Sequence, residues 1–474
     1  MLFSSLEFLY LYLPVTLLLY YLAPLKARNV VLLLVSLAFY GWGEPKYLAL
    51  MVATILIDYA AGLLIERSHG NAKRAKVWLI CAVVINLALL GFFKYSDFVL
   101  DNLRLIPSLS QLPRLDVPLP IGISFYTFQA LSYVIDVYRR EVKAQQDPIA
   151  FGTYVTLFPQ LIAGPIVRYR DVDEQLTSRS HSITMVASGL RTFLCGLAKK
   201  VLLANNMGEL WSLVRDMPNE QLTVATAWLG AVCYTLQIYF DFSGYSDMAI
   251  GLGRMLGFRF PENFYYPLTA RSLTDFWRRW HITLSSWFRE YVYIPLGGNR
   301  CSLPRSYLNL FAVWALTGLW HGASWNFVLW GLYFFVLLSL ERAFLGKWLQ
   351  KLPRAVGHVF TFVAVVFSFY IFVFDGSLPT LDANSALQYL SAMFGQNGAG
   401  FADGAFLFEL VRHAPLLTIC ALGLTPLPKR LFWRLYEKHR FMDAVTVVLC
   451  VAGLLLCTAY LVDSSYNPFL YFRF

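Results

Sequence analysis

Two histidines lie where their surroundings suit acid–base chemistry. His321 stands near the middle of a long apolar stretch, residues 308–333. A titratable side chain at membrane depth is costly and by default faces protein or water. A neutral imidazole there can remove a proton from a hydroxyl, because burial favours the uncharged ring. A structural histidine would give the same pattern, so catalysis is one of two interpretations.

Small and aromatic neighbours strengthen the catalytic interpretation of His321. Gly318 and Gly322 would let a substrate or another backbone approach closely. The sequence also offers two aromatic walls and one amide that can donate and accept hydrogen bonds. These predicted substrate-binding residues are Trp320, Trp325 and Asn326.

The second histidine, His281, falls in a pattern that predicts one amphipathic helix from Leu273 to Tyr291. Its apolar face would consist of Leu273, Phe276, Trp277, Trp280, Leu284, Trp287, Phe288 and Tyr291. Ser272 with Asp275 is expected to cap its start. Such a helix either lies in the membrane interface or lines a cavity. In a cavity, Arg278 and Arg279 would suit an anionic acyl carrier.

Polar residues also interrupt the apolar stretch 222–257. Asp241, Tyr245 and Asp247 could orient a histidine, or could join helices by polar contacts, and the pattern favours neither. No CxxC pair is present, and five of the seven cysteines lie in apolar runs. The sequence therefore predicts no metal site.

The elements that position these residues must be membrane-embedded helices. Charged residues make up 14% of the chain and hydrophobic residues 58%, whereas a soluble domain is about a quarter charged. Apolar segments of membrane-spanning length recur throughout, so the bilayer must be the solvent for most of them. We expect an all-α polytopic membrane protein with about eleven transmembrane helices plus re-entrant or interfacial helices. Residues 1–474 would form one integral membrane domain.

Basic residues orient the predicted spans. With the N-terminus outside, the loops expected in the cytoplasm carry clusters of Lys and Arg, while the connection 376–403 contains none. The same alternation places the C-terminus outside. The net charge of +10 is explained by these loops, so no nucleic-acid partner is predicted.

Five ordered blocks make the chain resemble the membrane-bound O-acyltransferase (MBOAT) family, in particular its bacterial alginate O-acetylation branch. The blocks are LPIGISFY (119–126), LIAGPI (161–166), YFDFSGYSDMA (239–249), FWRRWH (276–281) and GLWHG (318–322). The resemblance implies that residues 119–330 are the catalytic core. It also implies that His321 is the catalytic histidine and His281 a second important one. The helices would surround a central funnel in which a cytoplasmic acyl donor meets an acceptor from the other side.

The resemblance further implies a membrane O-acetyltransferase of the bacterial inner membrane that passes acetyl groups outward to a polysaccharide. The donor substrate would be acetyl-CoA or an acyl-carrier thioester, with no permanently bound cofactor. Implied partners are the lipid bilayer, periplasmic or surface SGNH-type acetyltransferase or esterase proteins, and the polysaccharide machinery. Open alternatives are D-alanyl or other acyl transfer to teichoic acid, peptidoglycan or cellulose. A transporter or flippase without bond chemistry is another, although no internal repeat is evident.

In the expected mechanism, His321 takes the proton from the acceptor hydroxyl as the oxygen attacks the acetyl carbonyl. Asn326 or His281 would donate a hydrogen bond to the developing oxyanion. A relay through an acetyl-histidine is the alternative.

Overall fold

The structure, a computed structural model, describes residues 1–374 and 383–463. Across these ranges the chain forms helices joined by loops, with no β-strand, so the all-α prediction is confirmed. Two compact units can be distinguished. Unit 1 comprises Met1–Gly196, Tyr245–Glu262 and Ser286–Val292, and unit 2 comprises Leu197–Gly244, Asn263–Ser285 and Tyr293–Phe474. That residues 1–474 act as one membrane domain stays a prediction.

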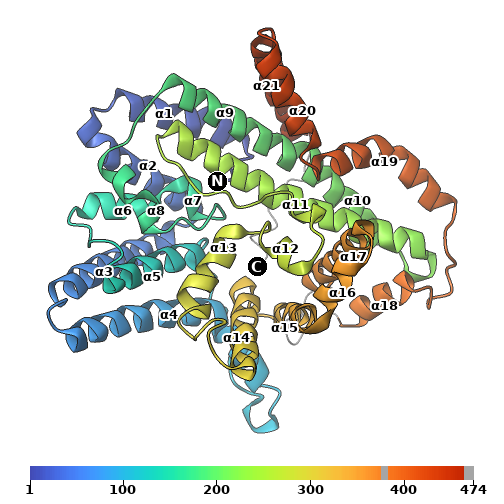
Figure 1. Ribbon diagram of the computed structural model, residues 1–474, viewed down its shortest axis with the longest axis horizontal. Helices are drawn as coiled ribbons and strands as arrows, with labels where there is room; N and C mark the ends of the chain where they lie inside the picture. Colours follow the sequence, from blue (N-terminus) through green and yellow to red (C-terminus); the bar gives the residue numbers. More distant parts are fainter. Residues whose placement is uncertain (375–382, 464–474) are drawn as a thin grey trace. The chain divides into compact units, whose positions relative to one another are not determined.

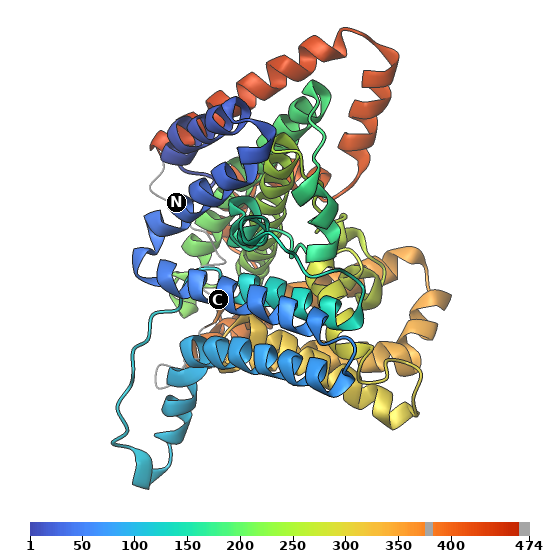
Figure 2. The ribbon, with the colours of Figure 1, turned by 90° about the vertical axis from the view of Figure 1, so that its left-hand side faces the viewer.

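Unit 1 holds the helices of the N-terminal part of the chain (Figure 1). They are α1 (Leu13–Leu22), α2 (Arg28–Gly43), α3 (Leu48–Arg67), α4 (Ala72–Leu103), α5 (Ile123–Arg139), α6 (Pro148–Thr156), α7 (Phe158–Leu161), α8 (Tyr169–Thr177) and most of α9 (Ile183–Ala198). Helices α3, α4 and α5 lie side by side, as Figure 2 also shows, and α2 packs against α6. The α3–α4 interface buries one polar pair, in which the Asn86 amide donates to Asp58 at 2.7 Å.

Unit 2 contains both histidines and the helices of the C-terminal part of the chain. They are α10 (Asn205–Arg215), α12 (Leu273–Trp277), α14 (Leu303–His321), α15 (Trp325–Leu340), α16 (Gly346–Lys351), α17 (Arg354–Val373), α18 (Ala383–Met393), α19 (Gly404–Gly423), α20 (Leu427–Lys438) and α21 (Met442–Asp463). Two helices, α11 (Val224–Met255) and α13 (Ile282–Phe288), contribute residues to both units. Helix α15 packs against α14 on one side and against α17 on another. The core between these helices is rich in large aromatic side chains, among them Trp277, Trp314, Trp330, Phe334 and Phe369.

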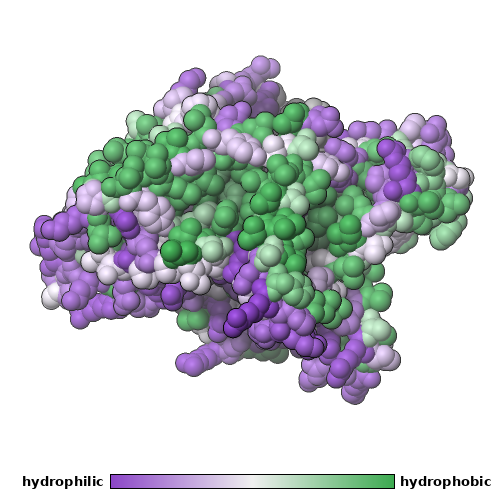
Figure 3. Space-filling model, turned by 90° about the horizontal axis from the view of Figure 1, so that it is seen from above, coloured by the Kyte–Doolittle hydropathy of each residue, from purple (hydrophilic) through white to green (hydrophobic). Residues whose placement is uncertain are grey.

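Seven helical segments of the described chain are long and apolar enough to cross a membrane. They are Leu25–Gly43, Pro45–Arg67, Ala72–Leu103, Trp325–Lys351, Arg354–Val373, Gly404–Gly423 and Met442–Asp463, and a shorter apolar helix covers Phe8–Leu22. The protein is therefore a multi-pass membrane protein, while the count of eleven spans stays a prediction. The surface view shows a broad apolar region bordered by hydrophilic residues (Figure 3), as expected where lipid is the solvent.

Unit 2 also buries an ion pair. Lys200 Nζ lies 2.8 Å from Asp241 Oδ1 in α11 and donates to Asn205 Oδ1 at 2.9 Å. The side chains of Lys200 and Asp241 are only 3% and 4% exposed. Buried charges persist in proteins when they are paired and hydrogen-bonded in this way.

Candidate active site

His321 is the last residue of α14, which ends because Gly322 adopts an extended conformation. Its side chain is 7% exposed and packs against three aromatic rings. The ring centroids lie 4.8 Å from Trp330, 5.0 Å from Trp320 and 5.3 Å from Phe372. All three contacts are edge-to-face, the arrangement that aromatic pairs prefer. The imidazole is thus fixed in an aromatic box at a helix end.

The two glycines beside His321 serve helix packing. A Cβ atom at Gly318 would collide with the carbonyl oxygen of Phe327, and one at Gly322 would collide with the Phe327 ring. Both glycines therefore let α14 approach α15 closely. Of the two uses predicted for them, close approach of another chain segment is the one that the structure displays.

The prediction of one continuous helix from Leu273 to Tyr291 is wrong. Helix α12 ends at Trp277, α13 begins at Ile282, and a π-helical turn, η8 (Arg289–Tyr293), follows. The expected apolar face is nevertheless buried, since its residues are each at most 8% exposed. The expected start is also confirmed, because the backbone N–H of Asp275 donates to the Ser272 hydroxyl at 3.1 Å.

The break occurs at His281, whose φ of 42° lies in the left-handed region that few non-glycine residues adopt. Backbone hydrogen bonds to a neighbouring loop hold it there. The N–H of Tyr265 donates to the Arg279 carbonyl at 2.9 Å, and the N–H of Ile282 donates to the Asn263 carbonyl at 3.0 Å. These bonds replace helical ones, so the loop bends the chain at the histidine.

The side chain of Asn263 fixes the protonation of His281. Its Oδ1 lies 3.1 Å from His281 Nδ1 and accepts hydrogen bonds from the Thr283 N–H at 3.3 Å and the Thr283 hydroxyl at 2.9 Å. A backbone N–H can only donate, so the atom at this point must be the amide oxygen. His281 Nδ1 therefore carries the proton and Nε2 carries the lone pair.

His281 is fully buried and its Nε2 has no hydrogen-bond partner among the described residues. Burial lowers the pKa of His281, so the ring stays neutral at neutral pH. A neutral ring with its proton on Nδ1 can accept a hydrogen bond at Nε2 and cannot donate one there. The expectation that His281 donates to an oxyanion thus conflicts with this tautomer.

Trp320 joins the two histidines within unit 2. Its ring centroid lies 5.9 Å from that of His281 and 5.0 Å from that of His321, and its side chain is buried. Phe242 also packs edge-to-face against His281, with ring centroids 4.8 Å apart. Trp320 therefore contacts both predicted catalytic residues.

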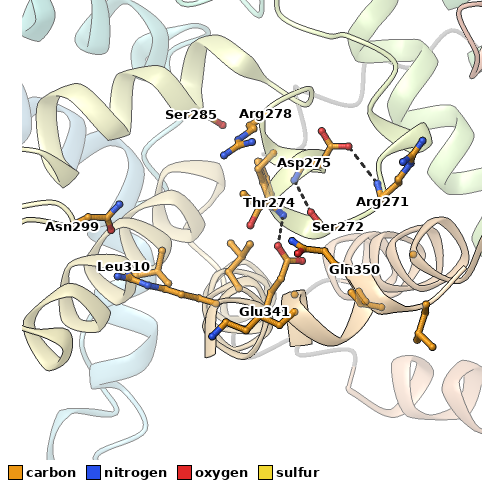
Figure 4. Close-up of a pocket in the computed structure, with 18 of the residues that line it drawn as sticks. Arg271, Ser272, Thr274, Asp275, Arg278, Ser285, Asn299, Leu310, Glu341 and Gln350 are labelled. Carbon is orange, nitrogen blue, oxygen red and sulfur yellow. Dashed lines mark hydrogen bonds between the residues drawn. The ribbon is translucent and has the colours of Figure 1, made fainter. Parts of the chain in front are cut away.

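A pocket of about 1050 Å³ opens in the same unit, lined mainly by α12, the π-helical turn η9 (Glu341–Leu345), α16 and the start of α17. Figure 4 shows its polar side chains. Glu341 accepts hydrogen bonds from the backbone N–H groups of Leu273 at 2.7 Å and Thr274 at 3.0 Å. These N–H groups lie at the start of α12 and have no acceptor within the helix. Asp275 accepts from Arg279 at 2.9 Å and from the backbone N–H of Arg271 at 3.4 Å. The two carboxylates of the pocket are thus both engaged.

The basic side chains that line this pocket outnumber its carboxylates. Within the described chain, no ion pair is formed by the lining residues Arg271, Arg278, Lys347 and Arg354. Arg342, which also lines the pocket, donates to the Ser306 hydroxyl at 2.8 Å. The lining thus carries five cations, Arg342 included, against the two carboxylates Asp275 and Glu341, so the pocket favours an anion.

Trp277 connects the pocket to the aromatic site. It lines the pocket, and its ring centroid lies 5.8 Å from that of Trp330, which in turn contacts His321. The indole N–H groups of Trp277 and Trp330 are both buried, and neither has an acceptor among the described residues. Two unsatisfied donors therefore lie between the basic pocket and His321.

The remaining predicted site residues are spread over both units. Asn326 lies beside the aromatic box, where its amide donates to the Phe372 carbonyl at 3.1 Å. Trp325 is 41% exposed, and Asp241 pairs with Lys200 as a helix-joining contact. Tyr245 belongs to unit 1, where it is buried and stacks on Phe3 at 4.6 Å. Asp247 is a half-buried residue of the same unit.

Sequence reasoning missed Asn263, Trp330 and Phe372, which contact the two histidines. Asn263 gives one usable signal, because it is a lone amide in a short segment between Pro261 and Pro267. Trp330 and Phe372 lie in uninterrupted apolar runs and give none. Across residues 1–374 and 383–463, no group of three or more His, Cys, Asp or Glu side chains could hold a metal ion.

The chain is similar to a family of known membrane proteins. The model of the MBOAT, membrane-bound O-acyltransferase family matches residues 123–380, a range that contains both histidines and most of the predicted core. The chain is 45% identical to the probable alginate O-acetylase AlgI of Pseudomonas aeruginosa, over 78% of this chain and 72% of that protein. It is 40% identical to the probable alginate O-acetylase AlgI of Pseudomonas putida over the whole of both chains.

A more distant relative is the peptidoglycan O-acetyltransferase of Helicobacter pylori, 33% identical over all of this chain and 98% of that protein. All three relatives bear the names of enzymes that act on O-acetyl groups. Full-length similarity of this kind rules out an unrelated transporter that merely shares the hydrophobic pattern. This chain belongs to the membrane-bound O-acyltransferase family.

Proposed function

We propose that this protein transfers an acetyl group from a cytoplasmic thioester donor, acetyl-CoA, for O-acetylation of an alginate-like polysaccharide outside the cell. In this proposal the protein lies in the bacterial inner membrane with both termini outside. It works together with SGNH-type partner proteins. The names of the AlgI relatives support the acetyl group and the polysaccharide. The observation that carries the proposal is the contact of Trp320 with both histidines.

In the proposed step, His321 removes the proton from the acceptor hydroxyl while the oxygen attacks the acetyl carbonyl carbon. The C–O bond forms, the carbon–sulfur bond breaks, and the coenzyme A thiolate leaves with the proton that His321 returns. A positioned base of this kind contributes about 10²–10⁴-fold. The alternative, a relay through an acetylated His321, uses the same residue as nucleophile.

The tautomer of His281 argues against one of the two expected oxyanion donors, and the amide of the other, Asn326, already donates to the Phe372 carbonyl at 3.1 Å. Trp330 is the best candidate for that role, because its indole N–H is buried, has no acceptor among the described residues and belongs to a ring in contact with His321. A donor held in a water-poor site stabilises developing negative charge without reorganising. His281, with its free lone pair on Nε2, is assigned to receive a hydrogen bond from the acceptor.

The basic pocket supports a phosphate-bearing donor. Coenzyme A carries several phosphate charges, and the pocket presents four cations without carboxylate partners. Trp277 would separate the phosphates from the reacting thioester near His321. Arg278 is then a donor-binding residue, whereas Arg279 holds Asp275 in place.

The test uses the purified protein in lipid nanodiscs with acetyl-CoA labelled in the acetyl group. His321→Ala is compared with wild type and with His439→Ala, a loop histidine at the end of α20. We expect thioester consumption by wild type and His439→Ala, and a loss of about 10²–10⁴-fold in His321→Ala. Equal rates in all three would remove His321 from the mechanism. If the protein consumed a D-alanyl carrier protein but not acetyl-CoA, the proposed donor would be wrong and the carrier protein would take its place.

A further inference from the structure

Two arginines and a histidine gather in unit 1 where α2 and α9 begin. Arg28 is the first residue of α2, and Arg179 and His181 lie in the segment that precedes α9. One guanidinium nitrogen of Arg28 lies 3.0 Å from His181 Nδ1 and 3.1 Å from His181 Nε2. Tyr20 Oη lies 2.8 Å from His181 Nε2 and accepts a hydrogen bond from Arg179 Nε at 3.1 Å. These contacts define the Arg28–Arg179–His181 cluster.

The hydrogen bonds of Tyr20 determine which ring nitrogen of neutral His181 carries the proton. The Tyr20 hydroxyl donates to the Leu256 carbonyl at 2.7 Å, so its oxygen must accept from His181 Nε2. The proton of the neutral ring is then on Nε2, and Nδ1 accepts from Arg28. Burial, then Arg28, then Arg179 lower the pKa of His181. Protonation would place a third positive charge between two others.

No carboxylate pairs with either arginine of the cluster in the described part of the chain. The charged groups that act on His181 are Arg28 and Arg179, both positive. Helices α2 and α9 both start here, and the N-terminal end of a helix carries partial positive charge. A half-buried group of cations with no counter-ion from the protein is an environment that favours a bound anion.

The cluster is firmly built. Arg179 also donates to Asn29 Oδ1 at 2.8 Å and to the Gln175 carbonyl at 3.1 Å, and its guanidinium lies 4.6 Å from the centroid of the Phe258 ring. Gly257 has a φ of 86°, and a Cβ atom there would lie 2.9 Å from His181 Nε2. Side chains fixed by packing bind a ligand without a large cost in conformational entropy.

The surface next to the cluster is apolar. Helix α1 exposes a row of large side chains that runs to its C-terminal end, consisting of Val15, Leu18, Leu19 and Leu22, which are 45%, 60%, 47% and 74% exposed. Leu25, between this helix and Arg28, is 72% exposed. Such a row offers no favourable contact to a soluble phosphate ion, whereas the acyl chains of a lipid can pack against it.

We propose that the Arg28–Arg179–His181 cluster binds the phosphate of an anionic phospholipid whose acyl chains lie along the exposed leucines of α1. The guanidinium groups supply charge-assisted hydrogen bonds to the phosphate oxygens. Helix α1 belongs to unit 1 and contains none of the residues assigned to acetyl transfer. The lipid is therefore a structural ligand of the N-terminal helices.

Binding is measured on the full-length protein by native mass spectrometry, with phosphatidylglycerol and phosphatidylcholine added in separate titrations. The variants are Arg28→Gln, Arg179→Gln and the double variant. The matched control is Lys73→Gln with Arg74→Gln, which removes two exposed cations at the start of α4. We expect wild type and control to bind phosphatidylglycerol selectively. Each cluster variant should bind it about ten-fold or more weakly, the loss expected for a hydrogen bond to a charged group.

The single variants keep the test decisive if the double variant does not fold. Equal affinity for the two lipids in wild type, or unchanged phosphatidylglycerol affinity in both single variants, would overturn the proposal. A further titration uses millimolar inorganic phosphate as a competitor. If phosphate alone displaces the lipid completely, the site is one for a small soluble anion, and the lipid assignment is wrong.

Discussion

The side-chain oxygen of Asn263 lies 3.1 Å from Nδ1 of His281 and, because it also accepts from Thr283, can only act as an acceptor there. Asn263 is thus a positioning residue that sets both the tautomer and the backbone break at His281. Asn263 lies outside the five sequence blocks that resemble the family.

Replacing Asn263 should impair catalysis through His281. In Asn263→Ala the ring loses its fixed orientation, and we expect kcat to fall by up to about 10²-fold, the cost of a misplacement of ~1 Å. Asn263→Asp keeps the acceptor and should recover part of the rate. Its carboxylate would raise the pKa of His281, so the acid limb of the kcat–pH profile should move to higher pH. Identical profiles for Asn263→Asp and wild type would argue against this role.

The buried state of His281 makes stability depend on pH. The pKa of His281 is lowered by burial from its ordinary value of 6.5, so the unfolded chain binds a proton more readily than the folded chain does. Stability is then fully present above about pH 6.5 and is lost as the pH falls below it. One proton corresponds to a slope of at most about 1.4 kcal/mol per pH unit.

His281→Gln should remove this contribution. Thermal unfolding in detergent between pH 7 and pH 5 should show a smaller loss of stability in the variant than in wild type. His181, whose pKa is also lowered by burial, contributes equally to both proteins and cancels in the difference. Parallel curves would mean that His281 is protonated in the folded protein or accessible to water.

Trp330→Phe tests the proposed oxyanion donor. Phenylalanine keeps an aromatic ring against His321 and removes only the indole N–H, so the fold should be retained. We expect kcat to fall by about 10²–10³-fold with little change in KM, as when one oxyanion donor is removed. Trp348→Phe, at a side chain that is 56% exposed, is the control. If the Trp330→Phe variant kept the wild-type kcat, Trp330 would not be the hydrogen-bond donor to the oxyanion.

The basic pocket predicts a different kinetic effect. Arg278→Gln and Lys347→Gln should each raise KM for acetyl-CoA about ten-fold and change kcat little, because in the proposed binding mode they contact phosphates far from the reacting carbon. Arg300→Gln, at an exposed position outside the pocket lining, should leave KM unchanged. If KM also stayed constant in both pocket variants, the donor phosphates would have to bind elsewhere.

The fold class followed from composition because the bilayer requires long apolar helices whose signal is strong. His321 could be singled out because a histidine in an apolar run is rare. The break at His281 could not be predicted, since helical periodicity continues through it and the bonds that cause it come from a loop some fifteen residues earlier. Trp330 and Phe372 were equally hidden, because their contacts with His321 depend on how α14, α15 and α17 pack.

Asp241 shows the opposite situation. Its sequence context was compatible with either orienting a histidine or joining helices, and the residue that decides, Lys200, lies some forty positions away. Local patterns identify polar residues in apolar helices, but they do not identify the partner.

The ion pair between Lys200 and Asp241 also bears on biogenesis. A lysine or aspartate buried among apolar side chains is costly without a partner, and neither residue lies in one of the seven segments of the described chain that could cross a membrane. Lys200 emerges from the ribosome before Asp241, and the two side chains neutralise each other only when both segments are present. This part of unit 2 should therefore reach its final packing only after α11 has been made, and removing either charge should delay that packing as well as destabilise the finished protein.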